Sequence, residues 1–287
     1  MITTHLVDRL RATLLQARES VFLRHFDSVE AEDKFGTVVT VADREAGALI
    51  NRTLAALTPG VPVLNEETSP ITDPAFIEAV FSARHVWAVD PIDGTTNYSM
   101  GNPNFCSAVA LCQCCEQEIR PIWGMMFDPT RNGFVYQDAD GAPVYELVGS
   151  YQKKLVLDRM KISALLKGGI IAVKPDVVEK AVRWRFHEAR RNQFIESQVM
   201  NGMLAAAGKL SAAAVGGHLW DFAAPFAVAS ALGLGPWRLD GTRLAEIPRS
   251  EFILDGDDPD DYWRLRGKAH AVIAHPALRD RFFSDGV

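Results

Sequence analysis

Two apolar, strand-like runs of this chain end in acidic residues, and its fold must place those charges where they are tolerated. His85–Val89 has the pattern of a buried strand and leads directly into Asp90-Pro91-Ile92-Asp93. Val61–Leu64 leads in the same way into Asn65-Glu66-Glu67. Carboxylates at strand ends can converge at one edge of a sheet, where their oxygens suit Mg²⁺ or Mn²⁺. Because crowded carboxylates raise one another's pKa, a divalent cation is their natural counter-charge.

The Asp90–Asp93 segment also has a simpler interpretation, because Asp, Pro and Gly are residues that turns favour. The residues that follow favour a binding site. Gly94-Thr95-Thr96-Asn97 supplies a flexible glycine, two hydroxyls and an amide. If a helix or turn begins there, its backbone N–H groups would point at an anion such as phosphate. Metal-holding carboxylates beside such a cradle are the arrangement that metal-assisted phosphate hydrolysis requires.

Composition and charge narrow the class of protein. The chain has 287 residues, of which 48% are apolar and 23% charged, as in soluble globular proteins. Its 30 Lys and Arg against 36 Asp and Glu give a net charge of −6, which argues against a nucleic-acid binder. The sequence has no apolar stretch that could span a membrane and no signal-peptide pattern at its start, so a cytoplasmic protein is expected.

The four cysteines, Cys106, Cys112, Cys114 and Cys115, are clustered in one strand-like run. A disulfide framework would be spread along the chain, so reduced and mostly buried thiols are expected. A zinc site is the alternative. Strand alternation argues against it, because it would send Cys115 to the opposite face from Cys112 and Cys114.

Hydrophobic periodicity predicts two halves, 1–150 with helices and a mainly antiparallel sheet, and 151–287 with alternating short strands and helices. In the first half it predicts a helix over 4–24, a second helix that opens at Asp43, and strands near 38–41, 61–64, 85–89, 105–115, 119–127 and 133–137. In the second half it predicts helices near 176–190, 197–208 and 222–232, and strands near 169–173, 211–215 and 270–274. An acidic loop over 255–261 is expected to lead into a helix at Tyr262.

Four segments carry a family resemblance. Val39–Glu45 contains Val-Thr-x-x-Asp, and Leu64–Thr68 contains a Glu-Glu pair. Trp87–Tyr98 and Gly217–Pro225 look like two metal-binding motifs, the second of the form Trp-Asp-x-Ala-Ala. In order and spacing they resemble the inositol monophosphatase family of Mg²⁺-dependent, lithium-sensitive phosphatases. The resemblance covers nearly the whole chain. It implies an α/β fold, a layered αβαβα sandwich, with the active site between the N-terminal and C-terminal halves.

The resemblance also implies a role for each matching residue. One Mg²⁺ would be held by Glu66, Asp90 and the backbone carbonyl of Ile92, and a second by Asp90, Asp93 and Asp221. A third, weakly held ion would lie near Glu66, with Glu67 beside it, and Mn²⁺ is a substitute. Asp43 would orient the Thr95 hydroxyl, which acts on the attacking water together with the ion held by Glu66. Phosphate and substrate contacts would come from Gly94, Thr95, Thr96, Glu196 and Ser197.

Two residues near the second motif have alternative interpretations. Asp221 precedes Phe222-Ala223-Ala224 and on its own would be a helix cap, so we expect it both to cap and to bind metal. His218 lies three residues earlier and is interpreted as a neighbour of the site rather than a ligand.

Departures from the family pattern concern the substrate side. Thr37 stands where the family usually has Asp, which would weaken the surroundings of the third ion. Glu196 replaces a glycine, and the inositol-binding acid falls at Ala214 or Val215, both apolar. The chemistry of phosphate hydrolysis is therefore expected, whereas inositol specificity is not.

The expected function is Mg²⁺-dependent hydrolysis of a small phosphate monoester by activated water. Inositol phosphate, fructose-1,6-bisphosphate, histidinol phosphate and a nucleotide 3′-phosphate all remain open as substrates. An alternative of another class is a regulatory or binding protein with little turnover, which the presence of Asp43, Asp93 and Asp221 argues against. The expected partner is a small phosphorylated metabolite, neither nucleic acid nor membrane, and the family often forms homodimers.

Overall fold

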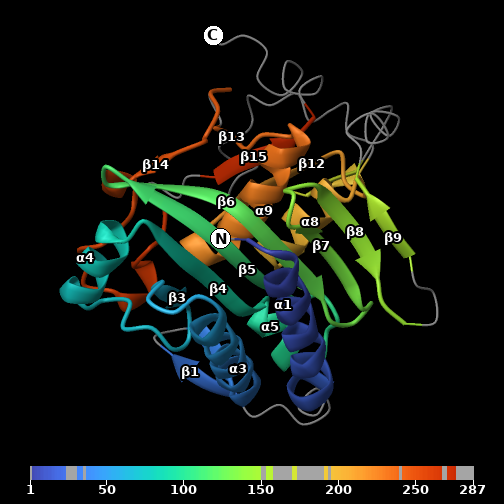
Figure 1. The fold of residues 1–287 in the computed structure, drawn as a ribbon, viewed down its shortest axis with the longest axis horizontal. Coiled ribbons are helices and arrows are strands. Elements are labelled where there is room, and N and C mark those ends of the chain that lie inside the picture. Colours follow the sequence, from blue (N-terminus) through green and yellow to red (C-terminus); the bar gives the residue numbers. More distant parts are fainter. Residues whose placement is uncertain are drawn as a thin grey trace.

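A large, mainly antiparallel sheet organises the chain (Figure 1). The computed structural model describes residues 2–23, 31–34, 37–149, 153–157, 170–172, 191–192, 195–238, 241–266 and 270–275. The strands of the large sheet follow the order β3-β4-β5-β6-β7-β8-β9, and β14 pairs with β6. Only the β3–β4 pair of this path is parallel. The strands are β3 (Val63–Asn65), β4 (His85–Asp93), β5 (Cys106–Cys115), β6 (Glu118–Asp128), β7 (Gly133–Gln137), β8 (Pro143–Leu147), β9 (Lys153–Val156) and β14 (Ile247–Pro248).

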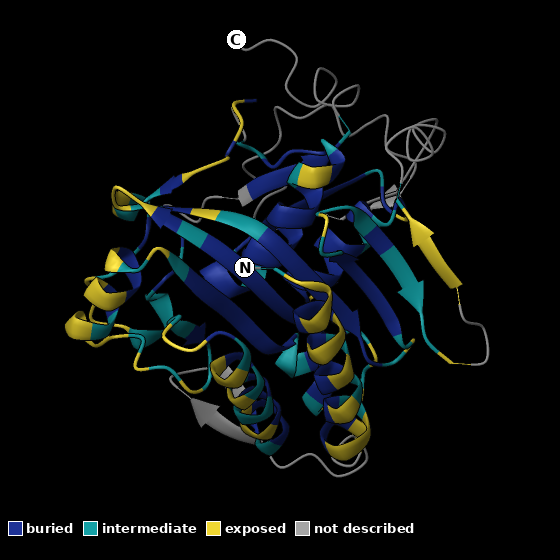
Figure 2. Ribbon diagram, viewed as in Figure 1, coloured by how far each residue is buried: buried dark blue, intermediate teal, exposed yellow. Residues whose placement is uncertain are grey.

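The strands in the middle of this sheet are buried on both faces, because both faces are covered by helices (Figure 2). In β4 the side chains alternate between two hydrophobic clusters: Val86 and Ala88 belong to one, Trp87 and Val89 to the other. The helices α1 (Thr4–Ala17) and α3 (Val41–Leu57) cover the second face, and a π-helical turn (Arg18–Phe22) follows α1.

The first face packs against α8 (Gln198–Ala206) and α9 (Leu219–Leu232), which also contact a second, smaller sheet. That sheet has the strand order β11-β10-β12-β15-β13. Its strands are β10 (Ile170–Ala172), β11 (Arg191–Asn192), β12 (Ala212–Gly216), β13 (Trp237–Arg238) and β15 (His270–Ala274). The described layers are thus helix, sheet, helix, sheet, which agrees with the first four layers of the expected αβαβα sandwich.

Two glycines, one in β6 and one in α8, let the backbones of these elements pack closely against α9. A Cβ added at Gly124 of β6 would lie 2.6 Å from the carbonyl oxygen of Ala224, and one at Gly202 of α8 would lie 2.5 Å from Cβ of Pro225. Contacts this short are not tolerated, so only glycine fits at both positions. Pro225 lies inside α9 and has no N–H, so the backbone carbonyl of Asp221 lacks its intrahelical partner.

The remaining short elements are a hairpin of β1 (Ala31–Lys34) and β2 (Thr37–Thr40), the helices α4 (Pro74–Ser82) and α5 (Thr95–Ser99), and two 3₁₀ turns (Arg249–Glu251 and Pro259–Asp261). None of the helices in the described part of the chain is long and apolar enough to cross a lipid bilayer.

The cysteines are free thiols; Cys106, Cys112 and Cys114 are buried and Cys115 is exposed, as strand alternation predicts.

Two predictions about local structure were wrong. The strand predicted to stop before Asp90 continues to Asp93, because a register shift between these residues lets β4 keep its pairing with β5. The acidic loop does not lead into a helix at Tyr262: a 3₁₀ turn precedes this residue, and Arg264 and Leu265 form isolated bridges. The predicted helix over 176–190 lies outside the described residues. The large sheet extends to Val156, and the division of the chain at residue 150 stays a prediction.

Candidate active site

Three carboxylates from two distant parts of the sequence meet at one end of β4. Asp90 and Asp93 come from its last residues and Asp221 from the first turn of α9. One oxygen from each lies within 4.8 Å of the others, close enough to surround one cation. The structure thus brings these three side chains together, and their role as metal ligands stays a prediction.

The electrostatics of the cluster require a counter-charge. Burial raises the pKa of Asp90 well above its ordinary value, and the charges of Glu66, Asp93 and Asp221 add to the rise. Asp90 is 1% exposed, and its Oδ1 has no hydrogen-bond partner among the described residues. Burial and the charge of Asp221 likewise raise the pKa of Asp93 to about 7. A buried carboxylate oxygen without a partner is costly unless it binds a proton or a cation, so the donor set fits a hard divalent ion.

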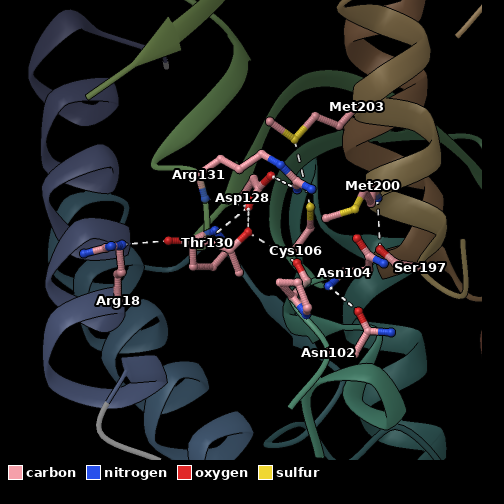
Figure 3. Close-up of polar contacts among 12 residues, drawn as sticks. Arg18, Asn102, Asn104, Cys106, Asp128, Thr130, Arg131, Ser197, Met200 and Met203 are labelled. Atoms are coloured by element: carbon pink, nitrogen blue, oxygen red, sulfur yellow. Dashed lines mark hydrogen bonds and ion pairs between the residues drawn. The ribbon is translucent and has the colours of Figure 1, made fainter. Parts of the chain in front are cut away.

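The N-terminal end of α8 holds Asp93 in place. Oδ2 of Asp93 accepts hydrogen bonds from the Ser197 hydroxyl (2.5 Å) and from the backbone N–H of Val199 (2.6 Å). Ser197 is also the N-cap of α8, because its hydroxyl accepts from the N–H of Met200 at 3.1 Å (Figure 3). Ser197 was predicted as a substrate contact. Its buried hydroxyl contacts Asp93 and its own helix, and the substrate contact stays a prediction.

Asp221 is a candidate ligand and takes part in a helix cap, but it is not the predicted N-cap of a helix that starts at Phe222: α9 begins at Leu219, and its N-cap is His218. Asp221 is the third residue of α9, and its Oδ2 accepts a hydrogen bond from the backbone N–H of His218 at 2.8 Å. Gly217 precedes this cap with φ +108°, and a Cβ there would overlap Oδ2 of Asp221. Glycine at 217 therefore lets the carboxylate sit against the backbone.

His218 lies beside the cluster and completes the cap. Its Nδ1 is 3.4 Å from Oδ2 of Asp221, its Nε2 is 2.6 Å from the carbonyl oxygen of Asp260, and its ring stacks on Trp220 at 4.8 Å. Because both ring nitrogens have protein partners, His218 supports the carboxylate rather than binding an ion itself. This placement agrees with its interpretation as a neighbour of the site.

A second group of residues joins the start of α3 to the start of α5. Thr40 and Asp43 form a capping box, and Oδ2 of Asp43 accepts from the N–H of Thr40 at 2.9 Å. The Thr95 hydroxyl lies 3.3 Å from Oδ1 of Asp43 and 2.9 Å from the carbonyl oxygen of Ile92. Burial raises the pKa of Asp43 to about 7, and the charge of Glu67 adds to this rise, whereas hydrogen bonds from Thr40 oppose it. The predicted Asp43–Thr95 pair is thus within contact distance.

Gly94 lets α5 begin close to the C-terminal half. Its φ is +94°, and a Cβ there would lie 3.1 Å from the carbonyl oxygens of both Asn104 and Glu196. Asn97 joins the same two carbonyls by donating from Nδ2 at 2.9 and 3.0 Å. The Glu196 side chain is exposed, so it is the backbone of this residue that contacts the site.

A cavity of about 270 Å³ opens beside the carboxylates. Residues 66–67 and 69–72 form one wall, and His218, Trp220, Pro259 and Asp260 form the other. Glu66 and Glu67 are half-buried at its edge, and Glu66 is near enough to raise the pKa of Asp90.

The structure adds four supporting residues that the sequence did not single out: Thr40, Asn97, Val199 and Gly217. The Thr40–Asp43 pair had a readable signal, since Ser or Thr three residues before an acid is the pattern of a capping box. Asn97 and Val199 act through amide or backbone groups that meet distant parts of the chain, which no local pattern reveals. Gly217 acts locally, because it makes room for the carboxylate of Asp221.

The sequence profile of the inositol monophosphatase family matches residues 2–260. The chain belongs to this family. The 3′(2′),5′-bisphosphate nucleotidase CysQ of Escherichia coli is 28% identical to it over 221 residues, which is 76% of this chain and 83% of that protein. The inositol-1-monophosphatase SuhB of Mycobacterium tuberculosis is 38% identical over 82 residues, 29% of this chain and 27% of that protein.

Solved structures of the family share the fold. Inositol monophosphatase-II from Staphylococcus aureus has a TM-score of 0.69 at 18% identity, with 99% of this chain and 95% of that chain covered. The suhB protein of Bartonella henselae has a TM-score of 0.69 at 18% identity, with 99% and 100% covered. The expected α/β sandwich and the expected enzyme class, a phosphoric monoester hydrolase of the inositol monophosphatase type, are confirmed.

Proposed function

We propose that the carboxylates of Glu66, Asp90, Asp93 and Asp221, with the carbonyl of Ile92, hold two or three Mg²⁺ ions for the hydrolysis of a small phosphate monoester. The observation that carries this proposal is the buried, unpartnered Oδ1 of Asp90, in a cluster whose three carboxylates approach within 4.8 Å. When bound, Mg²⁺ or Mn²⁺ would neutralise this cluster, lower the pKa of water and offset charge on the phosphate.

In this proposal Asp43 and Thr95 orient the attacking water. The Thr95 hydroxyl can give its single proton to Oδ1 of Asp43, at 3.3 Å, which leaves its oxygen free to accept a proton from water. Asp43 itself is fixed, because the N–H of Thr40 holds its other oxygen. The pair therefore positions a nucleophile without becoming one.

The phosphate would lie against the backbone of Gly94, Thr95 and Thr96, at the turn into α5. Support comes from the positive φ of Gly94, which turns the chain from β4 into α5 directly after Asp93. The cavity beside Glu66 and Trp220 gives room for the alcohol part of the ester. The exposed carboxylate of Glu196 would favour a substrate that carries a positive charge.

A nucleotide 3′-phosphate is the second candidate substrate besides a sugar or inositol phosphate. It is favoured by the CysQ relatives, which align with 76% of this chain, whereas the SuhB alignment covers 29%. A family member from Staphylococcus aureus has also been solved with 2′AMP bound.

The test is phosphate release at fixed Mg²⁺ from a panel of inositol 1-phosphate, fructose-1,6-bisphosphate, histidinol phosphate and adenosine 3′,5′-bisphosphate. The proposal expects turnover of at least one ester, and loss of that turnover in Asp90→Asn. Saturable binding of an ester without any phosphate release would favour the regulatory alternative.

We further propose that the protein acts in the cytoplasm as a homodimer. Four free thiols, three of them buried, support a reducing compartment. Sedimentation equilibrium of the purified chain tests the dimer, and a monomer at micromolar concentration would overturn it.

A further inference from the structure

A second cavity, of about 380 Å³, lies between α8 and the β6–β7 hairpin. None of the carboxylates Glu66, Asp90, Asp93 and Asp221 is among its lining residues, so it is separate from the site described above. Figure 3 shows Asp128 and Arg131 of the hairpin turned toward Met200 and Met203 of α8. Its volume lies within the range of small-molecule sites.

The floor of this cavity is apolar. The side chains that form it come mainly from α8 and the residues around it, and they are Ile195, Met200, Met203, Leu204, Ala207 and Leu210. Two of the six are methionines, whose flexible thioethers adapt to ligands of different shape. The floor therefore suits the hydrocarbon part of a ligand.

The only acid among the described lining residues, Asp128, is paired within its own hairpin. Its Oδ1 accepts from the N–H and hydroxyl of Thr130, at 3.0 and 2.7 Å, and from the N–H of Arg131 at 3.1 Å. Its Oδ2 accepts from Nη1 of Arg131 at 2.7 Å. The charge of this carboxylate is thus offset by Arg131, and most of its acceptor sites are occupied.

The rim of the cavity, formed by Arg131, Lys209 and Tyr145, has hydrogen-bond donors that are not used within the described part of the protein. Arg131 gives one side-chain N–H to Asp128 and keeps the rest of its guanidinium, and its side chain is 57% exposed. Lys209 is exposed and forms no ion pair with any residue that the structure describes. The Tyr145 hydroxyl likewise has no hydrogen bond to a described residue. Two cations against one paired acid leave a surplus of positive charge and of N–H and O–H groups.

We propose that this cavity binds a small organic anion, with its anionic head at Arg131 and Lys209 and its apolar body on the methionine-lined floor. The planar guanidinium suits a carboxylate or a phosphonate equally, because both offer two oxygens to its fork. One wall of the site is α8, whose N-terminal end holds Asp93, so the ligand sits one helix away from the candidate metal cluster.

The test is calorimetric titration of the full chain with 3-phenylpropanoate and with 2-phenylethylphosphonate. The protein is first dialysed against EDTA and then against chelator-free buffer, so that the carboxylate cluster holds no metal for the anionic head and no chelator competes for the cavity. We expect one saturable site per chain, and the tighter probe identifies the preferred head group. The neutral 3-phenylpropanamide should bind at least about tenfold more weakly, because charge-assisted hydrogen bonds are lost.

Variants localise the binding. Leu204→Trp should fill the cavity and abolish binding of the probe. Lys209→Glu, on the surface, should weaken binding at least about tenfold, because it places a charge of the same sign as the probe at the rim. Arg9→Gln removes an exposed cation from α1, on the other face of the large sheet, and should change nothing. The absence of saturation up to about 10 mM probe, the weak limit for a ligand of this size, would overturn the proposal. Unchanged binding by Lys209→Glu would overturn it as well, even if Leu204→Trp fails to fold.

Discussion

At the scale of single residues, the carboxylate of Asp93 has two roles. It is a candidate metal ligand in the acidic cluster, and it accepts hydrogen bonds from the N-terminal end of α8. Asp93→Asn keeps an oxygen for the N–H of Val199 but removes a charge that would neutralise Mg²⁺. We expect kcat to fall by about 10² or more, which corresponds to roughly 3 kcal/mol of transition-state stabilisation. The variant should fold, with a Tm in EDTA equal to or above that of the wild type, because repulsion in the cluster is relieved.

Steady-state kinetics and thermal melts of the same preparation check this prediction. Asp257→Asn is the matched control, because it removes an exposed carboxylate with no part in the site. Near-normal turnover by Asp93→Asn, or a variant that does not fold, would show that the assigned role is wrong.

Substrate choice also belongs to this scale. Ala214 and Val215, at the positions that resemble the inositol-reading acid, are buried on β12, while Glu196 presents an exposed carboxylate. A polyol is recognised by acceptors placed for its hydroxyls, and these residues do not provide them. We predict that myo-inositol 1-phosphate has a lower kcat/KM than at least one other ester of the panel. A clear preference for inositol 1-phosphate would refute this interpretation of residues 196–215.

At the scale of elements, the N-cap of α8 reaches a residue 104 positions away. Ser197→Ala removes both the cap and the hydrogen bond to Asp93, so it should lower stability by about 1 kcal/mol and weaken Mg²⁺ binding by about tenfold. Ser197→Thr keeps the hydroxyl and should restore both. Calorimetry of Mg²⁺ binding and urea unfolding measure the two effects.

Thr3→Ala separates the capping effect from the metal effect. Thr3 caps α1 in the same way, by accepting from the N–H of Leu6 at 3.2 Å, far from the carboxylates in the sequence. Thr3→Ala should lower stability about as much as Ser197→Ala and leave Mg²⁺ affinity unchanged. If Ser197→Ala behaved like Thr3→Ala in both measurements, Ser197 would be a cap and nothing more.

Elements whose signals are local were predictable from the sequence, whereas elements defined by distant partners were not. The apolar run of β4 and the acids after it follow one another in the chain, so the place of Asp90 and Asp93 at a strand end could be predicted from local sequence. Asp221 was expected beside them only because of the family resemblance. The bulge by which β4 extends to Asp93 depends on pairing with β5. The hydrogen bonds that hold the Asp93 carboxylate come from the N-terminal end of α8. The helix α4 was not predicted, although Asp73 and Pro74 are a typical helix start, because the whole helix has only nine residues.

At the scale of the whole molecule, the buried acids make the stability of the metal-free protein depend on pH. The folded-state pKa values of Asp43 and Asp93 are about 7, and that of Asp90 is also raised, whereas unfolded Asp titrates near 3.9. Over this interval the folded state binds more protons, so the free energy of unfolding falls as pH rises. We predict a lower Tm at pH 8 than at pH 5.5 in EDTA, with a smaller difference in 10 mM Mg²⁺, because the cation replaces the protons. A Tm in EDTA that rises over this interval would contradict the assignment.

The dependence of turnover on metal tests the whole account most directly. Phosphate release from the best ester of the panel is measured before dialysis against EDTA, after it, and after Mg²⁺ is restored. The cluster around Asp90 has no nucleophilic cysteine or histidine among its described members, so activity should vanish on chelation and return with Mg²⁺. Full activity in the dialysed, metal-free protein would contradict the central claim that these carboxylates work by holding a divalent cation.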